Sequence, residues 1–93
     1  MNFEWNNDKN QINYEKHGLN FEDVRILFLG ETVTFHDDRY DYGEERFVTL
    51  GEIEKRVIVV VHTQRGPMTR IISMRKANER EKKIYYQRLK ETG

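Results

Sequence analysis

The sequence of 93 residues contains no cysteine. This absence excludes a disulfide scaffold, thiol chemistry and a cysteine-based zinc site. The chain also lacks an apolar leader and any run of about 18 apolar residues, and its longest apolar stretch, residues 57–61, has only the length of a strand. These absences predict a soluble, cytoplasmic protein, and the length predicts a single domain, residues 1–93.

The motifs of metal and nucleophile chemistry are also missing. His17, His36 and His62 are scattered and form no H-x-x-x-H or H-x-H pair. There is no glycine-rich phosphate loop and no G-x-S-x-G elbow. The one serine, Ser73, stands among apolar residues, which favours a strand-pairing serine over a nucleophile. We therefore expect neither a metal site nor a cofactor.

Charge is balanced in total but divided along the chain. Residues 1–54 carry 13 acidic and five basic side chains, a net charge of −8. Residues 55–93 carry 11 basic and three acidic side chains, a net charge of +8. This division has two interpretations: either the basic half binds an anionic partner, or the two halves neutralise each other in the fold.

The periodicity of apolar residues predicts five strands and three helices. The strands are expected over residues 2–5, 32–35, 46–50, 56–63 and 68–74. The helices are expected after Asn6 or Asn7, after Asn20, and over residues 77–91, with Gly18 and Gly30 ending the first two. Residues 36–45 are expected to form a loop and residues 51–54 a hairpin turn. The predicted fold class is α+β, in the order β-α-α-β-β-β-β-α, with a mainly antiparallel sheet packed by helices.

Cationic side chains concentrate around the last predicted strand and the turn before it. They are Arg65, Arg70, Arg75 and Lys76. Strict alternation along the strand places Arg70 and Arg75 on opposite faces of the sheet. Guanidinium groups bind phosphate in a bidentate manner and stabilise charge that develops on a transferring phosphoryl group. The alternative is that these arginines pair with the acidic first half, for example with Glu44 or Glu45.

Two other positions combine titratable groups with alternative roles. The carboxylate of Glu45 precedes Arg46 and can act as a general base on a ribose 2′-OH, or belong to an ion pair or a solvated turn. His17 stands at the predicted end of the first helix, where the helix dipole favours its charged form. A histidine at this place is more often a helix cap than a catalyst.

Aromatic residues interleave with basic ones in the last predicted helix. Tyr85 and Tyr86 stand among Arg80, Lys82, Lys83 and Arg88. This pattern suits stacking of nucleobases beside a cationic surface. Because an amphipathic helix also needs aromatic core contacts, core packing is the alternative role for Tyr85.

Several segments together resemble the BrnT family. The first of them are Phe3-Glu4-Trp5, Lys9, Asn13, Lys16-His17-Gly18 and Phe21-Glu22-Asp23-Val24. The later ones are Gly43-Glu44-Glu45-Arg46, Gly51, Val59-Val60-Val61, Thr63-x-Arg65 and residues 70–77, followed by Glu81 and Tyr85. The segments K-H-G-x-x-F-E-D and R-I-I-S-x-R-K-A are the specific ones. The family usually has alanine where Met74 stands and often Asp-Pro where Asn6-Asn7 stands, and neither departure removes a catalytic candidate.

BrnT proteins are ribonuclease toxins of bacterial type II toxin–antitoxin pairs, with a fold similar to the RelE toxins. The resemblance therefore implies a metal-independent ribonuclease that cuts RNA and inhibits translation. It also implies a BrnA-type antitoxin as protein partner. It implies contact with DNA only indirectly, through the antitoxin, and no membrane partner.

The resemblance also suggests roles for particular residues. Arg65 and Arg75 would bind and stabilise the phosphate, and Glu45 would act as general base or hold an arginine in place. Lys9 and His17 are candidates for general acid or phosphate contact. The further RNA-binding positions are Arg46, Arg70, Lys76 and Tyr85.

Two other functions stay open at the level of the sequence. The first is a non-catalytic RNA- or protein-binding domain, which would shift RNA on a gel without shortening it. The second is a structural or signalling domain whose halves neutralise each other, which would have no salt-dependent affinity for RNA.

Overall fold

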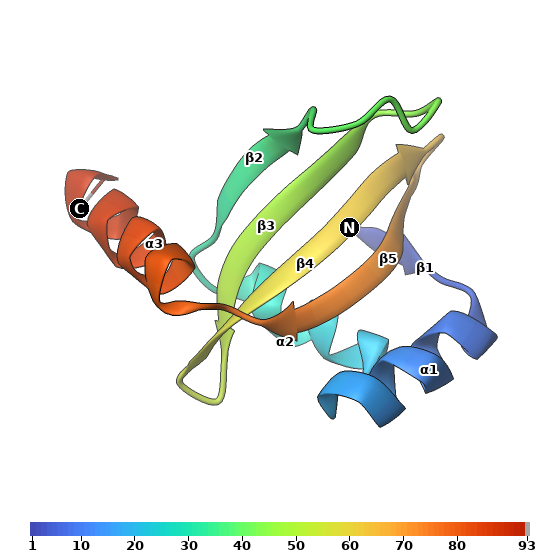
Figure 1. Cartoon of the computed structure of the whole chain (residues 1–93), viewed down its shortest axis with the longest axis horizontal. Helices are drawn as coiled ribbons and strands as arrows, with labels where there is room; N and C mark the ends of the chain where they lie inside the picture. Colours follow the sequence, from blue (N-terminus) through green and yellow to red (C-terminus); the bar gives the residue numbers. More distant parts are fainter. Residues whose placement is uncertain (93) are drawn as a thin grey trace.

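The computed structural model describes residues 1–92 and arranges them around one five-stranded sheet (Figure 1). The strands are β1 (Asn2–Glu4), β2 (Val33–Asp37), β3 (Arg46–Ile53), β4 (Arg56–Arg65) and β5 (Met68–Lys76). The helices are α1 (Asn7–His17), the 3-10 turn η1 (Phe21–Asp23), α2 (Val24–Leu29) and α3 (Glu79–Thr92). The predicted order of strands and helices is confirmed, and the second predicted helix is divided into η1 and α2.

The sheet is mixed, with the strand order β1-β5-β4-β3-β2. Strands β2 to β5 form consecutive antiparallel pairs, as short connections between neighbouring strands require. The N-terminal strand β1 instead pairs parallel to β5, with Asn2 opposite Met68. The α+β class is therefore confirmed, and one parallel pairing is added at the edge of the sheet.

Alternate residues of β4 point into two separate cores. Ile58 and Val60 pack with apolar side chains of η1 and α2, among them Phe21 and Leu27. Val57 and Val59 pack on the opposite face, in the cluster that contains Tyr85 of α3 and the partly buried Ile84 and Leu89. Because both faces of β4 are covered at this point, its apolar run is continuous rather than alternating. Within residues 1–92, no helix has the length and apolar character that crossing a membrane requires.

The first helix is fixed at both ends and in its middle. The Asn6 side chain accepts a hydrogen bond from the backbone N–H of Lys9, and Gly18 ends the helix in the left-handed conformation, with φ of 69°. In the middle, the buried Asn13 accepts a hydrogen bond from the backbone N–H of Met74 at 3.1 Å. Its amide also donates to the carbonyl of Leu19 at 3.3 Å. Asn13 therefore attaches α1 to β5 on the side of that strand not paired with β4.

The hairpin between β3 and β4 turns later than the sequence predicts. The prediction of a turn over residues 51–54 is wrong, because β3 continues to Ile53 and the turn consists of Glu54 and Lys55, with φ of 51° and 65°. Gly51 lies inside β3, where a Cβ atom would lie 2.7 Å from Cγ of Leu27. The glycine therefore allows α2 to approach the sheet closely and does not form the turn. Strand β2 also extends to Asp37, two residues into the predicted loop.

A β-bulge in β5 changes which side chains share a face of the sheet. The pairing passes from Val61 opposite Ser73 to His62 opposite Ile71, so Ile72 is an extra residue on β5. The predicted strict alternation, which separates Arg70 from Arg75, is therefore wrong. The extra residue brings both arginines to the same face of the sheet, because Arg70 lies opposite Thr63 and Arg75 lies opposite Val59.

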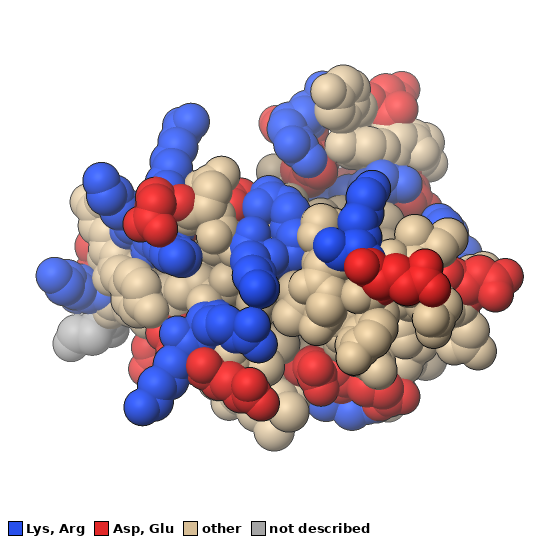
Figure 2. All heavy atoms as spheres, turned by 60° about the horizontal axis from the view of Figure 1, so that its bottom comes forward, with Lys and Arg blue, Asp and Glu red and all other residues tan. Residues whose placement is uncertain are grey.

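The division of charge along the sequence is also a division in space. The basic half of the chain forms β4, β5 and α3, whereas the acidic half forms α1, α2, β2 and also β1 and β3, which pair with β5 and β4, so the division in space is only partial. Lys and Arg side chains accordingly gather over α3 and next to it on the face shown in Figure 2. Acidic side chains border this region, so both interpretations of the charge division have a structural basis.

We expect Gly51→Ala to destabilise the fold by about 1–3 kcal/mol, because the added methyl group overlaps the fully buried Leu27. Thermal or urea unfolding followed by circular dichroism measures the change. Gly30→Ala is the matched control, since the nearest atom to its Cβ would be the Leu27 carbonyl oxygen at 3.7 Å. Equal stability of the two variants would contradict a close approach of α2 at Gly51.

Candidate functional site

Four arginines project from one face of the sheet, at the end that α3 leaves open. They are Arg46 on β3, Arg65 on β4, and Arg70 and Arg75 on β5, and together they are called the arginine face. Residues opposite each other in an antiparallel pair have their side chains on the same face of the sheet. Arg70 lies opposite Thr63 and Arg75 opposite Val59, so both arginines share a face with the odd-numbered side chains of β4. The cationic residues singled out in the sequence are thus brought together by the register of the sheet.

A cleft of about 400 Å³ opens on this face, between the end of β2 and the start of α3. Apolar side chains of the central strands line its base, among them Val48, Val59 and Val61. Two guanidinium groups line it as well, Arg75 from β5 and Arg39 from the loop after β2. The hydrogen bonds to Glu81 raise the pKa of Arg75, and burial and the like charge of Arg39 oppose this rise. The cleft therefore offers two positive groups above an apolar base, beside the carboxylates of Asp37, Asp38 and Glu81, which also line it.

Arg75 is held in place by the first turn of α3. Its Nη1 and Nη2 atoms donate to the two carboxylate oxygens of Glu81, each at 2.8 Å. Glu81 also accepts from the backbone N–H of Asn78, while the Asn78 side chain accepts from the backbone N–H of Glu81. This reciprocal pair is a capping box at the start of α3. The hydrogen bonds from Arg75 keep the pKa of Glu81 below its usual value.

Arg39 is held by a second bidentate ion pair. Its Nε and Nη2 atoms donate to the two oxygens of Asp37, at 2.9 and 3.1 Å. The side chain of Asp37 is only 2% exposed, and the hydrogen bonds from Arg39 hold the pKa of this carboxyl below its usual value. The hydroxyl of Tyr42 also donates to Asp37. The sequence analysis did not select Arg39, because a charged residue in a polar loop has no distinguishing periodicity.

The other arginines also pair with carboxylates of the acidic half. Glu44 lies 3.3 Å from Nε of Arg46 and 3.6 Å from Nη2 of Arg65, so it bridges two of them. Arg70 lies 3.8 Å from Glu4 on the neighbouring β1. The predicted alternative, pairing with the acidic half, is therefore confirmed for Arg65 through Glu44 and for Arg70 through Glu4, whereas Arg75 pairs with Glu81 of the basic half.

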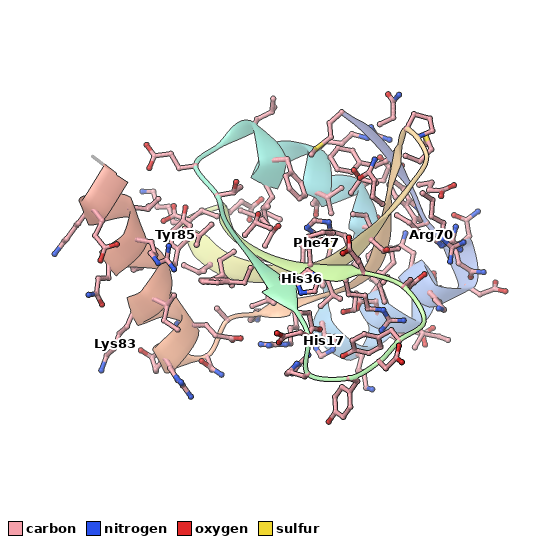
Figure 3. The ribbon with its side chains drawn as sticks, turned by 90° about the horizontal axis from the view of Figure 1, so that it is seen from above. His17, His36, Phe47, Arg70, Lys83 and Tyr85 are labelled. Carbon is pink, nitrogen blue, oxygen red and sulfur yellow. The ribbon has the colours of Figure 1, made fainter. Side chains whose placement is uncertain are left out.

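Glu45 contacts a histidine rather than an arginine. Its Oε1 atom lies 3.9 Å from Nε2 of His36, a residue that borders the cleft at the end of β2. His36 lies opposite Phe47 on the edge of the sheet, and its ring meets the Phe47 ring edge-on, with centroids 5.4 Å apart (Figure 3). The His36 side chain is half exposed at this edge. From its local sequence pattern, His36 could be considered only as a metal ligand.

The remaining predicted residues lie outside the cleft. Lys9 and His17 are exposed on α1, and neither side chain forms a hydrogen bond or ion pair within residues 1–92. Lys76 is exposed at the end of β5. Tyr85 is 2% exposed and donates its hydroxyl hydrogen to the carbonyl of Glu31 at 2.8 Å, so its assignment as an RNA-stacking residue is wrong and core packing is its role.

The third histidine belongs to the interior. His62 contacts the hydroxyl of Thr49 at 2.7 Å and lies against the rings of Phe28 and Phe47. Burial lowers the pKa of this imidazole, which favours its neutral form. Among residues 1–92, no group of three or more histidine, aspartate and glutamate side chains is arranged to hold a metal ion.

We expect Glu81→Ala to lower the free energy of unfolding by about 1–2 kcal/mol, because it removes both the helix cap and the partner of Arg75. Glu79→Ala, at the first residue of α3 and paired only with Lys82 on the surface, should cost less than about 0.5 kcal/mol. Urea unfolding at pH 7 compares the two.

The difference between wild type and Glu81→Ala also depends on pH. Since the fold lowers the pKa of Glu81 from 4.5, its contribution is present above pH 4.5 and disappears as the pH falls through the lower, folded value. The two unfolding curves should therefore approach each other in acid. A constant difference from pH 7 down to strong acid would contradict an ionised Glu81 in the folded chain.

A family model described as the ribonuclease toxin BrnT of type II toxin–antitoxin systems matches residues 5–81. No curated protein matches the chain. The matched range includes α1, the whole of β2 to β5, the loop that carries Arg39, and the capping box of α3. The chain belongs to the BrnT family of ribonuclease toxins.

Proposed function

We propose that the chain is an endoribonuclease that cuts RNA in the cleft of the arginine face, without a metal ion. The observation that carries this proposal is the pair of guanidinium groups, Arg39 and Arg75, that line one open cleft in a member of a ribonuclease family. A phosphodiester between them would be contacted by guanidinium groups that Asp37 and Glu81 hold in place, through the N–H donors that these carboxylates leave open. The apolar base beneath it raises the strength of these charge interactions by excluding water.

The reaction that suits these groups uses the substrate's own nucleophile. The ribose 2′-oxygen attacks the adjacent phosphorus, its proton passes to a general base, and the bond from phosphorus to the 5′-oxygen breaks. The leaving 5′-oxygen takes a proton from a general acid, and the products are a 2′,3′-cyclic phosphate and a 5′-hydroxyl. The negative charge that develops on the phosphoryl oxygens is stabilised by Arg39 and Arg75.

We assign the general base to His36, supported by Glu45. An imidazole has a pKa near the working pH and can accept the 2′-proton. The carboxylate of Glu45 lies 3.9 Å from Nε2 of His36. His36 lies opposite Phe47, and Phe47 lies opposite His62, so the imidazole is on the face of the sheet opposite the arginine face. It can therefore meet an RNA in the cleft only where the RNA bends over the edge strand β2. Lys9 and His17 remain candidates for the general acid or for phosphate contact, contributed from α1.

Arg46, Arg65 and Arg70 would contact phosphates on either side of the cut. Their carboxylate partners Glu44 and Glu4 are not deeply buried, so an incoming phosphate replaces one anion with another at low cost. The same ion pairs keep the face neutral in the absence of RNA. This arrangement favours binding of polyanions that offer several phosphates at once over binding of single anions.

The family also supports a cellular role. A type II toxin is paired with an antitoxin protein, and we propose a BrnA-type antitoxin, with DNA contacted only through it. RNA cleavage in the cytoplasm would inhibit translation. The sheet with one helix-covered and one open cationic face further supports a RelE-like architecture.

We expect the purified chain to shorten single-stranded RNA, and Arg75→Ala or Arg39→Ala to lower kcat at least about 100-fold, because each removes a donor to the developing charge. Cleavage should persist in excess chelator. It should stop on RNA carrying 2′-O-methyl groups, since that substrate has no nucleophile. Gel analysis with mapping of the cyclic phosphate measures both effects.

Lys16→Ala on the surface of α1 is the control for removal of one positive charge. His36→Gln and His17→Ala, followed over pH, decide which imidazole is the base: disappearance of the acidic limb of the kcat profile identifies it. Binding of RNA without shortening, in a folded wild-type chain, would reject the ribonuclease and support the RNA-binding alternative.

We also expect induced expression of the wild-type chain in bacteria to arrest growth and reduce protein synthesis. A soluble Arg39→Ala/Arg75→Ala variant should do neither, because it retains the fold but lacks charge stabilisation. Growth curves, pulse labelling of new protein and total RNA integrity measure the difference. Equal arrest by both chains would show that toxicity does not depend on these two arginines.

A further inference from the structure

A second cavity, outside the cleft, collects positive charge at the C-terminal end of β5. Its volume is about 260 Å³. It lies between the hairpin turn of β3 and β4, the end of β5 and the first turns of α3, and its cationic lining consists of Lys55, Arg56, Lys76 and Lys82. These residues are called the basic pocket. Figure 2 turns this end of the molecule toward the viewer and shows Lys and Arg side chains crowded there.

The lining of the basic pocket contains no carboxylate among the residues that the structure describes. Arg56 pairs with Glu54 at 3.9 Å and Lys82 with Glu79 at 3.2 Å, and both carboxylates are more than four-fifths exposed, so solvent weakens these pairs. The ammonium groups of Lys55 and Lys76 have no ion pair within residues 1–92. This differs from the arginine face, where a carboxylate partners every arginine. Positive charge in the basic pocket is therefore only weakly compensated by neighbouring carboxylates.

The backbone around the basic pocket fixes where the cations lie. Glu54 and Lys55 both adopt positive φ, a conformation that side chains rarely take, and the two-residue turn needs it to join β3 to β4 without splaying them. The backbone N–H of Ala77 donates to the carbonyl of Val57 at 3.0 Å, which ties the end of β5 to the start of β4. The cations thus come from segments that are fixed relative to one another.

The chemistry of the lining favours a phosphodiester chain over an acidic protein segment. Tyr86 lines the pocket with a side chain that is 45% exposed, and its hydroxyl donates to Glu52 at 3.1 Å, so the ring is fixed beside the cations. A fixed aromatic ring beside cations suits a stacked nucleobase next to its phosphate. The two cavities are bordered by neighbouring residues, because Arg75 lines the cleft and Lys76 lines the basic pocket, although the register places Arg75 opposite Val59 and Lys76 opposite Ile58, on different faces of the sheet.

We propose that the basic pocket binds the sugar–phosphate backbone of the RNA segment that flanks the cleavage site, so that one strand passes from Arg75 over Lys76 to Lys55 and Lys82. This proposal rests on the proposed ribonuclease function and extends it to a second substrate-binding site. The pocket contributes to affinity for long RNA and takes no part in the chemical step.

The test compares Lys55→Gln/Lys82→Gln with Lys16→Gln/Lys83→Gln, a control that removes the same charge elsewhere. Lys16 is on α1, and Lys83 points away from the sheet in Figure 3. Affinity is measured first by fluorescence anisotropy with a 2′-O-methyl RNA of about 20 nucleotides, which fills a groove of several nucleotides and is not cut. The pocket variant should bind about tenfold more weakly, and its slope of log affinity against log salt should fall by about 1.4, or about 0.7 for each phosphate that is no longer bound.

Cleavage is then measured on a long RNA and on a dinucleotide with one phosphate. The pocket variant should raise KM for the long RNA with kcat unchanged, and should cut the dinucleotide as the wild type does. The anisotropy measurement needs no cleavage. A chain that binds RNA but does not cut it would therefore reject the proposed ribonuclease function, while the affinity difference between the variants would still test the basic pocket.

Equal affinity and salt slope in the pocket and control variants would overturn the proposal. So would unchanged RNA binding with weakened binding of poly-glutamate, which would identify the pocket as a site for an acidic protein. Thermal unfolding verifies that each variant is folded, and the single variant Lys55→Gln, at the exposed turn, replaces the double variant if that one is unstable. A proportionately smaller decrease in affinity is expected from it.

Discussion

One extra residue in β5 determines what the open face of this protein presents. If β5 alternated regularly, Arg70 and Arg75 would lie on opposite faces, and either Ile71 or Met74 would be exposed on the arginine face. The bulge at Ile72 instead places Ile71 and Met74 together in the core beneath α2 and both arginines at the surface. Next to the bulge, the side chain of Asn13 on α1 accepts a hydrogen bond from the backbone N–H of Met74. This N–H has no partner on a neighbouring strand, and α1 therefore supplies its acceptor.

The arginine face also shows how a cationic surface is kept stable before it meets its ligand. Several guanidinium groups close together repel one another, and this repulsion is relieved by carboxylates that the acidic half of the chain supplies. Glu4, Asp37 and Glu44 come from β1, from the end of β2 and from the loop after it, all next to the arginines in space. Neutral total charge and a polyanion-binding surface are therefore compatible, because the arginines that these carboxylates neutralise remain partly exposed to an incoming phosphate.

Much of the fold follows from the sequence, and the site follows in part. The order of strands and helices, the caps at Asn6, Asn20 and Gly18, and the buried valine run come from local rules of periodicity and capping. The sequence predicts the turn at Gly51 because glycine is common both in turns and where two elements pack closely. The residue that requires a glycine here is Leu27, which is 24 positions away in the sequence. The bulge has a trace in the sequence, since Ile71 and Met74 are spaced by three rather than two. No sequence pattern distinguishes Arg39 or His36, because their positions beside the cleft depend on the strands that the fold brings next to them.

The contact between Arg75 and Glu81 joins three features that the sequence leaves separate. It fixes a guanidinium group in the cleft, it completes the capping box that starts α3, and it sets where that helix leaves the sheet. The position of α3 in turn decides how much of the sheet face is covered and how much is open. It also places Lys82, one residue after Glu81, in the lining of the basic pocket. The cleft and the basic pocket are thus positioned by the same helix turn, and a strand of RNA that contacts both would bind across a junction that these hydrogen bonds hold in place.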